Sequence, residues 1–428
     1  MRVFLSCLVC RIVTFVLHKL GRGATSMPGK VALKVKRNVL KDLSKNTKVI
    51  VVTGTNGKTT SCRILEEGLK KAGKSYFINK SGANLITGVT ASFIMNSTVT
   101  GKCKKDYAII ECDENAFKEV SRYIHCDVIL VTNVFRDQLD RYGEVTHTLN
   151  AIKESVKNLP NAIVCLDADC SLTYSMSKEI SNKIITFGVN VPFDKNAKAP
   201  EISDAKYCIF CKHEYDYTYH TYGHLGGFVC NNCGYKRPQP DFAVESVEEM
   251  KNDHSVVVAN LNGDRNIIKV NIGGAYNIYN AIGCAAALTA LGIEQKIIID
   301  AIENFNGAFG RMEHFKAGNN TVNLILVKNP AGFSQTMNFL KSIDDDFTLI
   351  LSLNDNAADG RDISWIWDVD FSGIFDKPNV KELYVTGKRC YDMAVRVKYE
   401  GVGNREIKII ENEDYNKLVD VATSQGRD

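Results

Sequence analysis

Residues 51–60 read Val-Val-Thr-Gly-Thr-Asn-Gly-Lys-Thr-Thr, and no other stretch says more about the fold of this chain. The β-branched run Val49–Val52 predicts a buried strand, and a helical pattern covers Lys58–Lys71. Gly54 and Gly57 permit a tight turn between the two elements. A strand–turn–helix of this kind points backbone N–H groups and a helix N-terminus at one spot, which is an arrangement that binds polyphosphate.

Two side chains of this turn suit a nucleotide and its metal. Lys58 is expected to reach the β- and γ-phosphates, and the hydroxyl group of Thr59 is expected to hold Mg²⁺. The strict P-loop pattern has glycine where Val52 stands, so this turn is a variant. The alternative is an ordinary turn with a chance Gly-Lys-Thr, but the flanking strand and helix favour phosphate binding.

The composition indicates a globular protein of about two to four domains. Among 428 residues, 45% are apolar and 24% are charged, and the net charge of +4 is too small to indicate nucleic-acid binding by itself. Most of the 14 cysteines lie singly in apolar runs, as Cys62, Cys165 and Cys284 do, which is typical of small buried hydrophobic residues. A large α/β chain of this kind fits a reducing cytosol.

The N-terminal segment Met1–Leu20 contains two apolar runs that Arg11 separates. Neither run has the roughly 18 apolar residues of a membrane span, and a signal peptide would need a longer apolar core. We therefore expect an amphipathic helix packed on the main domain, with a peripheral membrane contact as the alternative. Residues 21–29 are expected to form a loop because they are rich in glycine and small polar residues.

From Lys48 onward, short apolar strands alternate with helical segments, which predicts a mostly parallel sheet flanked by helices. The expected strands of this sheet are Lys48–Val52, Tyr107–Glu111, Asp127–Val131, Ala162–Leu166 and Lys183–Phe187. Two further strands and a helix are expected at Ser255–Leu261, Ile267–Ile272 and Tyr276–Leu291. A second α/β region is expected to have strands near Val322–Val327, Phe347–Leu353 and Glu382–Thr386.

Four cysteines form two matched pairs, Cys208-x-x-Cys211 and Cys230-x-x-Cys233, with 18 residues between the pairs. Two such pairs can close tetrahedrally around Zn²⁺. The zinc is expected to be structural, because four thiolates leave no open position and so small an insert can hardly bury a core. A nucleic-acid-binding ribbon is disfavoured by the mixed charge of the insert, and a redox dithiol does not need two matched pairs.

Acidic residues follow the expected strand that ends at Glu111. An acid at the carboxyl end of a parallel strand beside a P-loop is well placed to hold Mg²⁺. Asp113 or Glu114 could take this role instead, and a solvated acidic loop is the remaining alternative.

Three later segments carry polar groups that suit a nucleotide site. Asn277 and Asn280 lie three residues apart at a helix start, where amides can bind an adenine edge or a ribose, although Asn277 could equally be a cap. Arg311 offers a guanidinium for phosphate charge, or is simply on the surface. The acidic stretch Asn354–Asp368 reads as a functional loop after a strand, or as an Asx-turn with a helix cap.

Together these residues resemble the Mur ligase family. The resemblance rests on Thr53–Thr60, Asn84, Glu111, Asn277, Asn280 and Gly310–Glu313. The four-cysteine insert, the string Arg136–Gly143 and the loop Asn354–Asp368 narrow the resemblance to the MurT-type subunits of lipid II isoglutaminyl synthase. The implied fold is α/β. It comprises an N-terminal helix and loop (1–45), a Mur ligase-like P-loop ATPase domain (46–310) with a zinc-ribbon insert (206–238), and a C-terminal α/β domain (311–428).

The resemblance also implies roles for individual residues. ATP would lie on the turn and contact Thr55, Asn56, Gly57, Lys58, Thr59, Thr60, Asn277, Asn280 and Arg311. Within this set, Asn280 would face adenine and Arg311 would face the triphosphate. Thr59 and Glu111 would hold Mg²⁺, and Asn84 would approach the phosphates of the substrate.

Such subunits convert the α-carboxyl group of D-glutamate in the lipid II stem peptide to an amide, through an acyl phosphate that ammonia attacks. The chain lacks a Gly-x-Cys-x-Gly nucleophile turn, so the ammonia is expected to come from a GatD-type glutaminase in a heterodimer. By the resemblance, Asp355 would complete the Cys-His pair of that partner. The implied location is the cytoplasm, at the inner face of the membrane through the lipid-linked substrate, with at most a peripheral membrane contact of the protein and no nucleic-acid partner.

The chain departs from ordinary Mur ligases at two places. Asp137-Gln138 stands where an Asp-His pair is usual, and the segment around Lys328 lacks the usual acidic string. Both changes weaken the case for a second Mg²⁺ site and for amino-acid binding. The remaining alternatives are a ligase that adds an amino acid without a partner, of the Mur or folylpolyglutamate type, and a non-catalytic ATP-binding scaffold.

Overall fold

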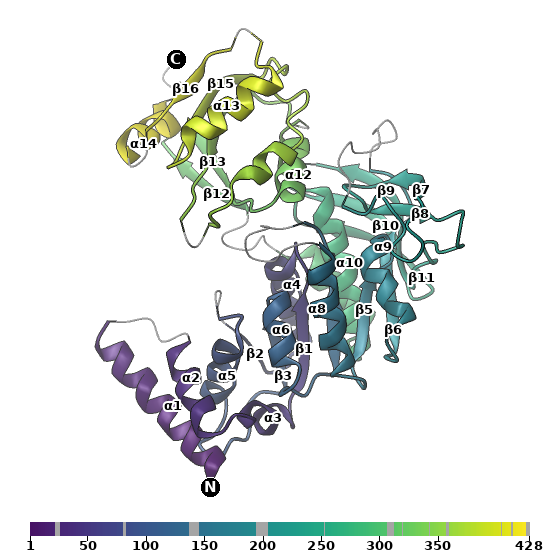
Figure 1. Ribbon diagram of the computed structural model, residues 1–428, viewed down its shortest axis with the longest axis vertical. Helices are drawn as coiled ribbons and strands as arrows, with labels where there is room; N and C mark the ends of the chain where they lie inside the picture. Colours follow the sequence, from purple (N-terminus) through teal and green to yellow (C-terminus); the bar gives the residue numbers. More distant parts are fainter. Residues whose placement is uncertain are drawn as a thin grey trace.

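A computed structural model gives the arrangement of the chain (Figure 1). It describes residues 1–21, 26–79, 83–136, 145–193, 204–251, 253–305, 312–318, 320–341, 343–356, 359–403, 405–411 and 414–424. Arg311 and the segment Asp137–Gly143, on which part of the sequence interpretation rests, lie outside these residues.

A nine-stranded sheet forms the centre of the molecule, in the order β11-β10-β9-β6-β5-β4-β1-β3-β2. The strands from β2 to β9 in this order pair in parallel, whereas β9, β10 and β11 pair antiparallel. Their bounds are β1 Lys48–Thr53, β2 Tyr76–Ile78, β3 Tyr107–Glu111, β4 Val128–Val131, β5 Ile163–Asp167, β6 Ile184–Val189, β9 Phe242–Met250, β10 Ser255–Leu261 and β11 Asp264–Val270. The central strands are almost fully buried, as is typical of a parallel sheet covered by helices.

Helices pack around this sheet (Figure 1). Helix α4 contacts both α10 and α11, and α6 contacts α8. The helices of this region are α4 Lys58–Lys71, α5 Ile86–Met95, α6 Glu114–Val120, α8 Val145–Lys157, α9 Ser171–Ser175, η1 Met176–Lys178, α10 Ala275–Ala290 and α11 Gln295–Glu303. One hydrophobic core joins them to the sheet and includes side chains from Cys7 to Phe305.

Three helices precede the sheet: α1 Arg2–Lys19, α2 Met27–Val35 and α3 Val39–Ser44. The predicted N-terminal helix is present and packs on α2 and α5, but the expectation that it is amphipathic is wrong. Its buried face carries Ser6, Cys7, Cys10, Thr14 and Leu17, and most of its large apolar side chains are exposed. The expected loop at residues 21–29 is also too long, because α2 begins at Met27 with Pro28 in its first turn.

The C-terminal region has a separate core around the parallel sheet β14-β15-β16. Its elements are the hairpin β12 Met312–Ala317 and β13 Asn320–Ile325, then α12 Pro330–Lys341, β14 Phe347–Ser352, η2 Ser364–Asp368, β15 Val380–Thr386, α13 Cys390–Glu400, β16 Ile407–Ile409 and α14 Tyr415–Ser424. The core of this sheet lies between α12, α13 and the segment that contains η2.

Most predicted elements are present within one to three residues of their expected bounds, and the helix at Lys58–Lys71 begins and ends where the sequence indicates. The strand expected at Ile267–Ile272 is wrong in its start, because it begins at Asp264. A two-residue turn at Asn262-Gly263, both with positive φ (55° and 106°), closes a tight hairpin between β10 and β11. The short strand β2 and the strand β9 were not expected from the sequence.

Candidate active site

The turn between β1 and α4 is shaped by two glycines with positive φ, 117° at Gly54 and 87° at Gly57. A Cβ atom on Gly57 would lie 2.1 Å from Oδ1 of Asn280, and one on Gly54 would lie 2.4 Å from Oγ1 of Thr132. Both positions therefore exclude a side chain for steric as well as conformational reasons. The turn ends at the N-terminus of the 14-residue helix α4, so its free N–H groups face the space above β1.

Lys58, the first residue of α4, is buried and lies against an acidic partner. Its Nζ atom donates to Oε1 of Glu114 at 2.9 Å, to the carbonyl oxygen of Thr55 at 3.2 Å and to that of Gly54. Burial raises the pKa of Glu114, and the ammonium group of Lys58 opposes that shift. The alternative of a solvated acidic loop therefore does not hold for Glu114, whose carboxylate is the counter-ion of Lys58.

The hydroxyl group of Thr59 lies 3.2 Å from Oε1 of Glu111, so the two expected magnesium ligands are brought together. Asp113, an alternative ligand, instead caps α6 by accepting from the backbone N–H groups of Asn115 and Ala116. A hydroxyl and a carboxylate oxygen are ligands that suit Mg²⁺. Of the three acids considered from the sequence, Glu111 is the one whose carboxylate contacts the hydroxyl group of Thr59.

Asn79 holds the end of β3 and was missed by the sequence interpretation. Its amide donates to the carbonyl oxygens of Ala83 (3.0 Å) and Glu111 (2.9 Å), and its Oδ1 accepts from the N–H group of Glu111 at 2.8 Å. Asn84, the expected substrate contact, lies beside the same strand end, where its carbonyl oxygen is 3.7 Å from Sγ of Cys112. No signal in the sequence pointed to Asn79, because the short strand β2 that precedes it was itself not expected.

Asn277 and Asn280 are both buried in the first turns of α10. Asn277 donates to the carbonyl oxygen of Gly273 at 2.6 Å, and its Oδ1 accepts from Asn280 at 2.9 Å. Oδ1 of Asn280 lies 3.5 Å from Oγ of Ser61, and it also lies against Gly57. Asn277 thus acts within the start of its own helix, while Asn280 supports the back of the phosphate turn.

Asn56 at the tip of the turn is held by asparagines from two distant segments. Its N–H group donates to Oδ1 of Asn133 at 2.9 Å, after the end of β4. Its Oδ1 accepts from Nδ2 of Asn329 at 2.9 Å, and Oδ1 of Asn329 accepts from the N–H group of Gly332 at the start of α12. Asn329 is buried, and its place before Pro330 was the only sequence signal that it starts a helix.

The acidic loop after β14 contains both Asp355 and Asp368. The carboxylate of Asp355 is about one-third exposed and lies 3.7 Å from Nη1 of Arg389. Asp368 pairs at 2.9 Å with Arg136, whose Nε lies 3.3 Å from Asp204. The loop is thus tied to the central region through Arg136, while the carboxylate of Asp355 stays accessible to solvent.

Thiol sulfurs of Cys208, Cys211, Cys230 and Cys233 all lie within 4.8 Å of one another. Both pairs form the same tight turn, in which the N–H group of the residue after each pair (Lys212 or Gly234) donates back to the first cysteine at 2.9 Å. Lys212 and Gly234 share a positive φ, 61° and 75°. Four convergent thiols with this geometry fit a tetrahedral metal ion.

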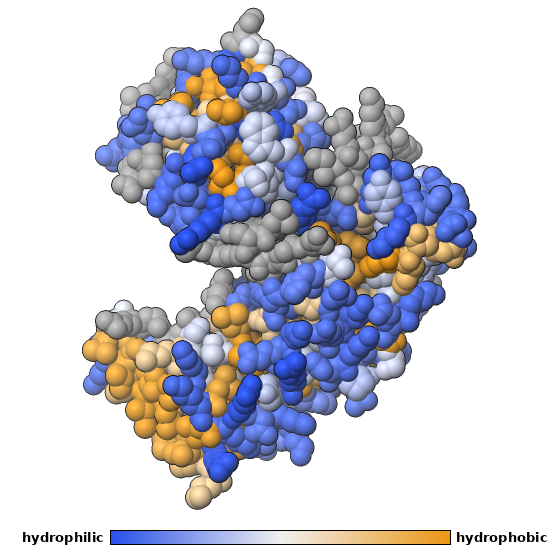
Figure 2. Space-filling view, in the orientation of Figure 1, coloured by the Kyte–Doolittle hydropathy of each residue, from blue (hydrophilic) through white to orange (hydrophobic). Residues whose placement is uncertain are grey.

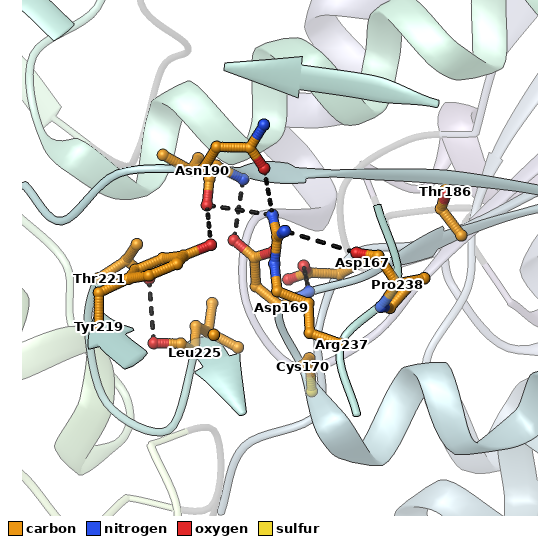
Figure 3. A network of polar contacts seen from close by, with 12 residues as sticks. Asp167, Asp169, Cys170, Thr186, Asn190, Tyr219, Thr221, Leu225, Arg237 and Pro238 are labelled. Atoms are coloured by element: carbon orange, nitrogen blue, oxygen red, sulfur yellow. Dashed lines mark hydrogen bonds and ion pairs between the residues drawn. The ribbon is translucent and has the colours of Figure 1, made fainter. Parts of the chain in front are cut away.

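A buried polar network holds the insert against the sheet (Figure 3). Arg237 donates to Asp169 at 2.6 Å, just beyond β5, and to Oδ1 of Asn190 at 2.9 Å. Asp169 also accepts from the hydroxyl group of Tyr279 on α10 and from the N–H group of Val189. Burial raises the pKa of Asp169, and Arg237 opposes the shift. The paired charge fixes the insert, whose strands are β7 Asp216–His220 and β8 Gly226–Val229, at the carboxyl edge of the sheet.

Comparison with known proteins gives two family matches and full-length relatives. Residues 52–233 match the Mur ligase middle domain, and residues 326–428 match the MurT ligase C-terminal domain. The chain is 35% identical to the lipid II isoglutaminyl synthase (glutamine-hydrolyzing) subunit MurT of Streptococcus pneumoniae, with 99% of this chain and 95% of the relative covered. It is 33% identical to the protein of the same name from Staphylococcus aureus strain N315, with coverage of 93% and 87%.

Solved structures with the same fold include MurF from Acinetobacter baumannii, with a TM-score of 0.67 and 16% identity over 93% of this chain and 75% of that chain. A pseudomurein peptide ligase type C from Methanothermus fervidus gives a TM-score of 0.63 and 23% identity over 85% and 67%. At these identities the likeness shows the fold alone, and it is the Mur ligase-like α/β fold that the sequence predicts. The MurT-type resemblance stated from the sequence is confirmed by the full-length relatives.

Proposed function

The chain belongs to the MurT branch of the Mur ligase family, and from this membership we propose that it is the ATP-dependent ligase subunit that amidates lipid II. The product is the isoglutaminyl form, in which the α-carboxyl group of D-glutamate in the stem peptide has become an amide. The observation that carries this proposal is the match along 99% of the chain to a subunit of that name, including the C-terminal domain. It also favours this function over a ligase that adds an amino acid without a partner.

The proposed reaction has two steps. An oxygen of the substrate carboxylate attacks the γ-phosphorus of ATP, and ADP leaves, which gives an acyl phosphate. Ammonia then attacks the carbonyl carbon, phosphate leaves, and the lost proton passes to solvent. The first step is needed because a carboxylate has no acceptable leaving group, whereas phosphate is a good one.

Lys58 is proposed to stabilise the charge that develops on the transferred phosphoryl group. Its ammonium group lies at the N-terminus of α4 beside the turn that would hold the phosphates, and it would exchange contacts with Glu114 and two carbonyl oxygens for the nucleotide. Thr59 and Glu111 would hold Mg²⁺, which would supply positive charge to offset the charge of the nucleotide phosphates. Asn280 is proposed to face adenine and Arg311 to face the triphosphate. Asn84 is proposed to approach the phosphates of the substrate.

The four cysteines of the insert are proposed to bind a structural zinc ion. Their sulfurs converge from two matched turns, and four thiolates would leave no position for a substrate. The insert has only a small aromatic core, made by Tyr215, Phe228 and Tyr235, so the metal would supply much of its stability.

The ammonia is proposed to come from a separate glutaminase subunit of the GatD type. The relatives are named as one subunit of a glutamine-hydrolyzing synthase, which implies a partner. Asp355 is proposed to orient the imidazole group of the partner's Cys-His pair, and its solvent-accessible carboxylate supports this role. The lipid-linked substrate would hold the complex at the inner face of the membrane.

The test is to incubate the chain with lipid II, ATP and glutamine, with and without a candidate glutaminase, and to measure the product mass. Amidated lipid II, 1 Da lighter than the acid because –OH becomes –NH₂, should form only when ATP and a nitrogen source are both present. An increase that matches an added amino acid would overturn the proposal in favour of the partner-free ligase.

The role of Asp355 has its own test within this assay. Asp355→Asn should abolish amidation with glutamine and leave amidation with ammonium chloride unchanged. Asp362→Asn is the matched control, because Asp362 lies in the same loop and its Oδ1 accepts from the N–H group of Ser364 at 2.9 Å, which asparagine can also do. Equal loss of both activities in Asp355→Asn would rule out the role in glutamine hydrolysis.

A further inference from the structure

Helix α1 presents large apolar side chains to solvent along its whole length. Figure 2 shows them as a continuous apolar surface over the N-terminal helices. The exposed fraction is 45% for Phe4, 52% for Ile12, 61% for Phe15 and 64% for Leu20. The other exposed apolar residues of this surface are Leu5, Leu8 and Val16 on α1, Met27 on α2 and Met95 on α5. Surface helices of globular proteins usually turn such residues inward, so this face is built to be covered.

The opposite face of α1 packs on the protein mainly through small residues, together with Leu17. Oγ of Ser6 donates to the carbonyl oxygen of Ala32 at 3.2 Å, and Cys7 and Cys10 are fully buried. Arg11 donates to the carbonyl oxygens of Ile94 (3.1 Å) and Ser97. The helix therefore packs on α2 and α5 through small side chains, Leu17 and one arginine, and its outer face is exposed.

The charge around this face is mostly positive, and Asp42, which pairs with Lys36, is the acidic residue that follows α2. Residues 1–41 contain nine lysines and arginines and no aspartate or glutamate. The exposed ones include Arg2 and Lys19 at the two ends of α1, and Lys30 and Lys34 on α2. Lys102 and Lys104 extend the basic area, because a Cβ atom on the adjacent Gly101 would lie 2.4 Å from Val3 of α1.

We propose that α1 docks the protein on the surface of an anionic lipid bilayer, with its apolar face in the acyl boundary and the basic residues among the headgroups. An apolar face with mostly basic residues around it matches such a surface in both respects. Protein interfaces are instead depleted of lysine. Among the described residues, no helix is long and apolar enough to cross a membrane.

This inference deepens the proposed function. Binding of α1 to a bilayer does not depend on that function, but the benefit of such binding to the enzyme does. A lipid-linked substrate presents its head group at the bilayer surface, and a docked enzyme searches for it in two dimensions. The basic N-terminal helices would set which side of the molecule faces the membrane, independently of whether substrate is bound.

Co-sedimentation of the full-length chain with lipid vesicles tests the proposal. The wild type should bind vesicles that contain phosphatidylglycerol and bind pure phosphatidylcholine much less, and binding should weaken with salt. The variant Leu8→Ser/Ile12→Ser/Phe15→Ser should bind vesicles about tenfold or more weakly, because it lacks three apolar side chains that would enter the bilayer. Lys30→Glu/Lys34→Glu should lose about tenfold or more on anionic vesicles through charge alone.

The matched control is Ile267→Ser/Leu324→Ser/Leu326→Ser, which removes three similarly exposed apolar residues far from α1 and should bind as the wild type does. The circular dichroism spectra of all variants should match the wild type. Vesicle binding by the α1 variant equal to the wild type would overturn the proposal. So would α1-dependent self-association, or loss of a partner subunit from the α1 variant, because another occupant would then cover this face.

The amidation assay separates this inference from the proposed function. In detergent micelles, the α1 variant should amidate lipid II at the wild-type rate, whereas on vesicles its rate should fall with its binding. Amidation that is absent in both settings for the wild type would refute the function and leave the vesicle result intact.

Discussion

Replacement of Lys58 by alanine should destabilise the fold as well as abolish catalysis, because its partner Glu114 is buried. The side chains are 8% and 4% exposed, and Nζ lies 2.9 Å from Oε1. Removing one member of such a pair leaves the other charge unpaired and typically costs about 3–5 kcal/mol. For a domain of this size, that corresponds to a fall in melting temperature of roughly 6–20 °C.

The penalty should depend on pH in a definite direction. Burial already raises the pKa of Glu114, and without Lys58 nothing of comparable strength opposes it. The folded variant would then bind a proton more tightly than the unfolded chain, whose glutamate pKa is about 4.3. Stability of Lys58→Ala should therefore fall as pH rises from about 4.3 through the raised folded-state pKa. Relative to the wild type, the variant should be least stable at neutral pH and above.

The double variant Lys58→Ala/Glu114→Gln separates the electrostatic penalty from lost packing. Because glutamine is neutral and nearly isosteric, it should restore most of the lost melting temperature at pH 7.5 and remove the pH dependence, while ATP turnover stays abolished. Calorimetry of the four proteins of the cycle from pH 5 to 8.5 measures the coupling. A melting temperature of Lys58→Ala within about 2 °C of the wild type at pH 7.5 would refute the reasoning.

Three further changes probe separate parts of the site. Thr59→Val should raise the Mg²⁺ concentration needed for half-maximal ATP turnover with little change in melting temperature, because it removes only the hydroxyl group that lies 3.2 Å from Glu111. A Mg²⁺ titration of ATP turnover measures this change. An unchanged midpoint would contradict a magnesium site at Thr59 and Glu111. Cys211→Ser should lower the zinc content from about one ion per chain to near zero and reduce the melting temperature, as judged by elemental analysis and calorimetry. Asn329→Ala should raise the KM for ATP and lower the free energy of unfolding by about 1–3 kcal/mol, because the Oδ1 of Asn56 loses a buried donor. Equal KM values for the variant and the wild type would exclude a role of this hydrogen bond in shaping the turn.

Local signals in the sequence predict the framework of the site well. The strand before Gly54 and the helix from Lys58 follow from a β-branched run, two glycines and a 3.6-residue period, all of which act over a few residues. The pairing of Thr59 with Glu111 also follows, because the carboxyl ends of neighbouring parallel strands meet at one edge. The four cysteines converge as their spacing predicts.

Contacts between side chains far apart in the chain could not be predicted from the sequence. Glu114 reads as one acid among several, and only the fold shows that it is buried against Lys58, 56 positions away. The exposure of the large apolar side chains of α1 was missed for a related reason. Hydrophobic periodicity indicates a helix but does not say which face packs, and here tight packing against α2 and α5 selected the small residues.

The turn between β1 and α4 is a local motif in sequence, but asparagines from three distant segments hold it in place. Asn280 from α10 backs Gly57, Asn133 from the end of β4 holds the backbone of Asn56, and Asn329 reaches the side chain of Asn56 from the start of α12. The third of these contacts crosses from the C-terminal region, whose core is separate from that of the large sheet. Since α12 also packs on the segment that contains η2, the contact that steadies the phosphate turn belongs to the same packed unit as the loop of Asp355. The start of α12 therefore contacts the turn that would bind ATP, and the body of α12 packs on the segment that follows Asp355, the carboxylate proposed for glutamine hydrolysis.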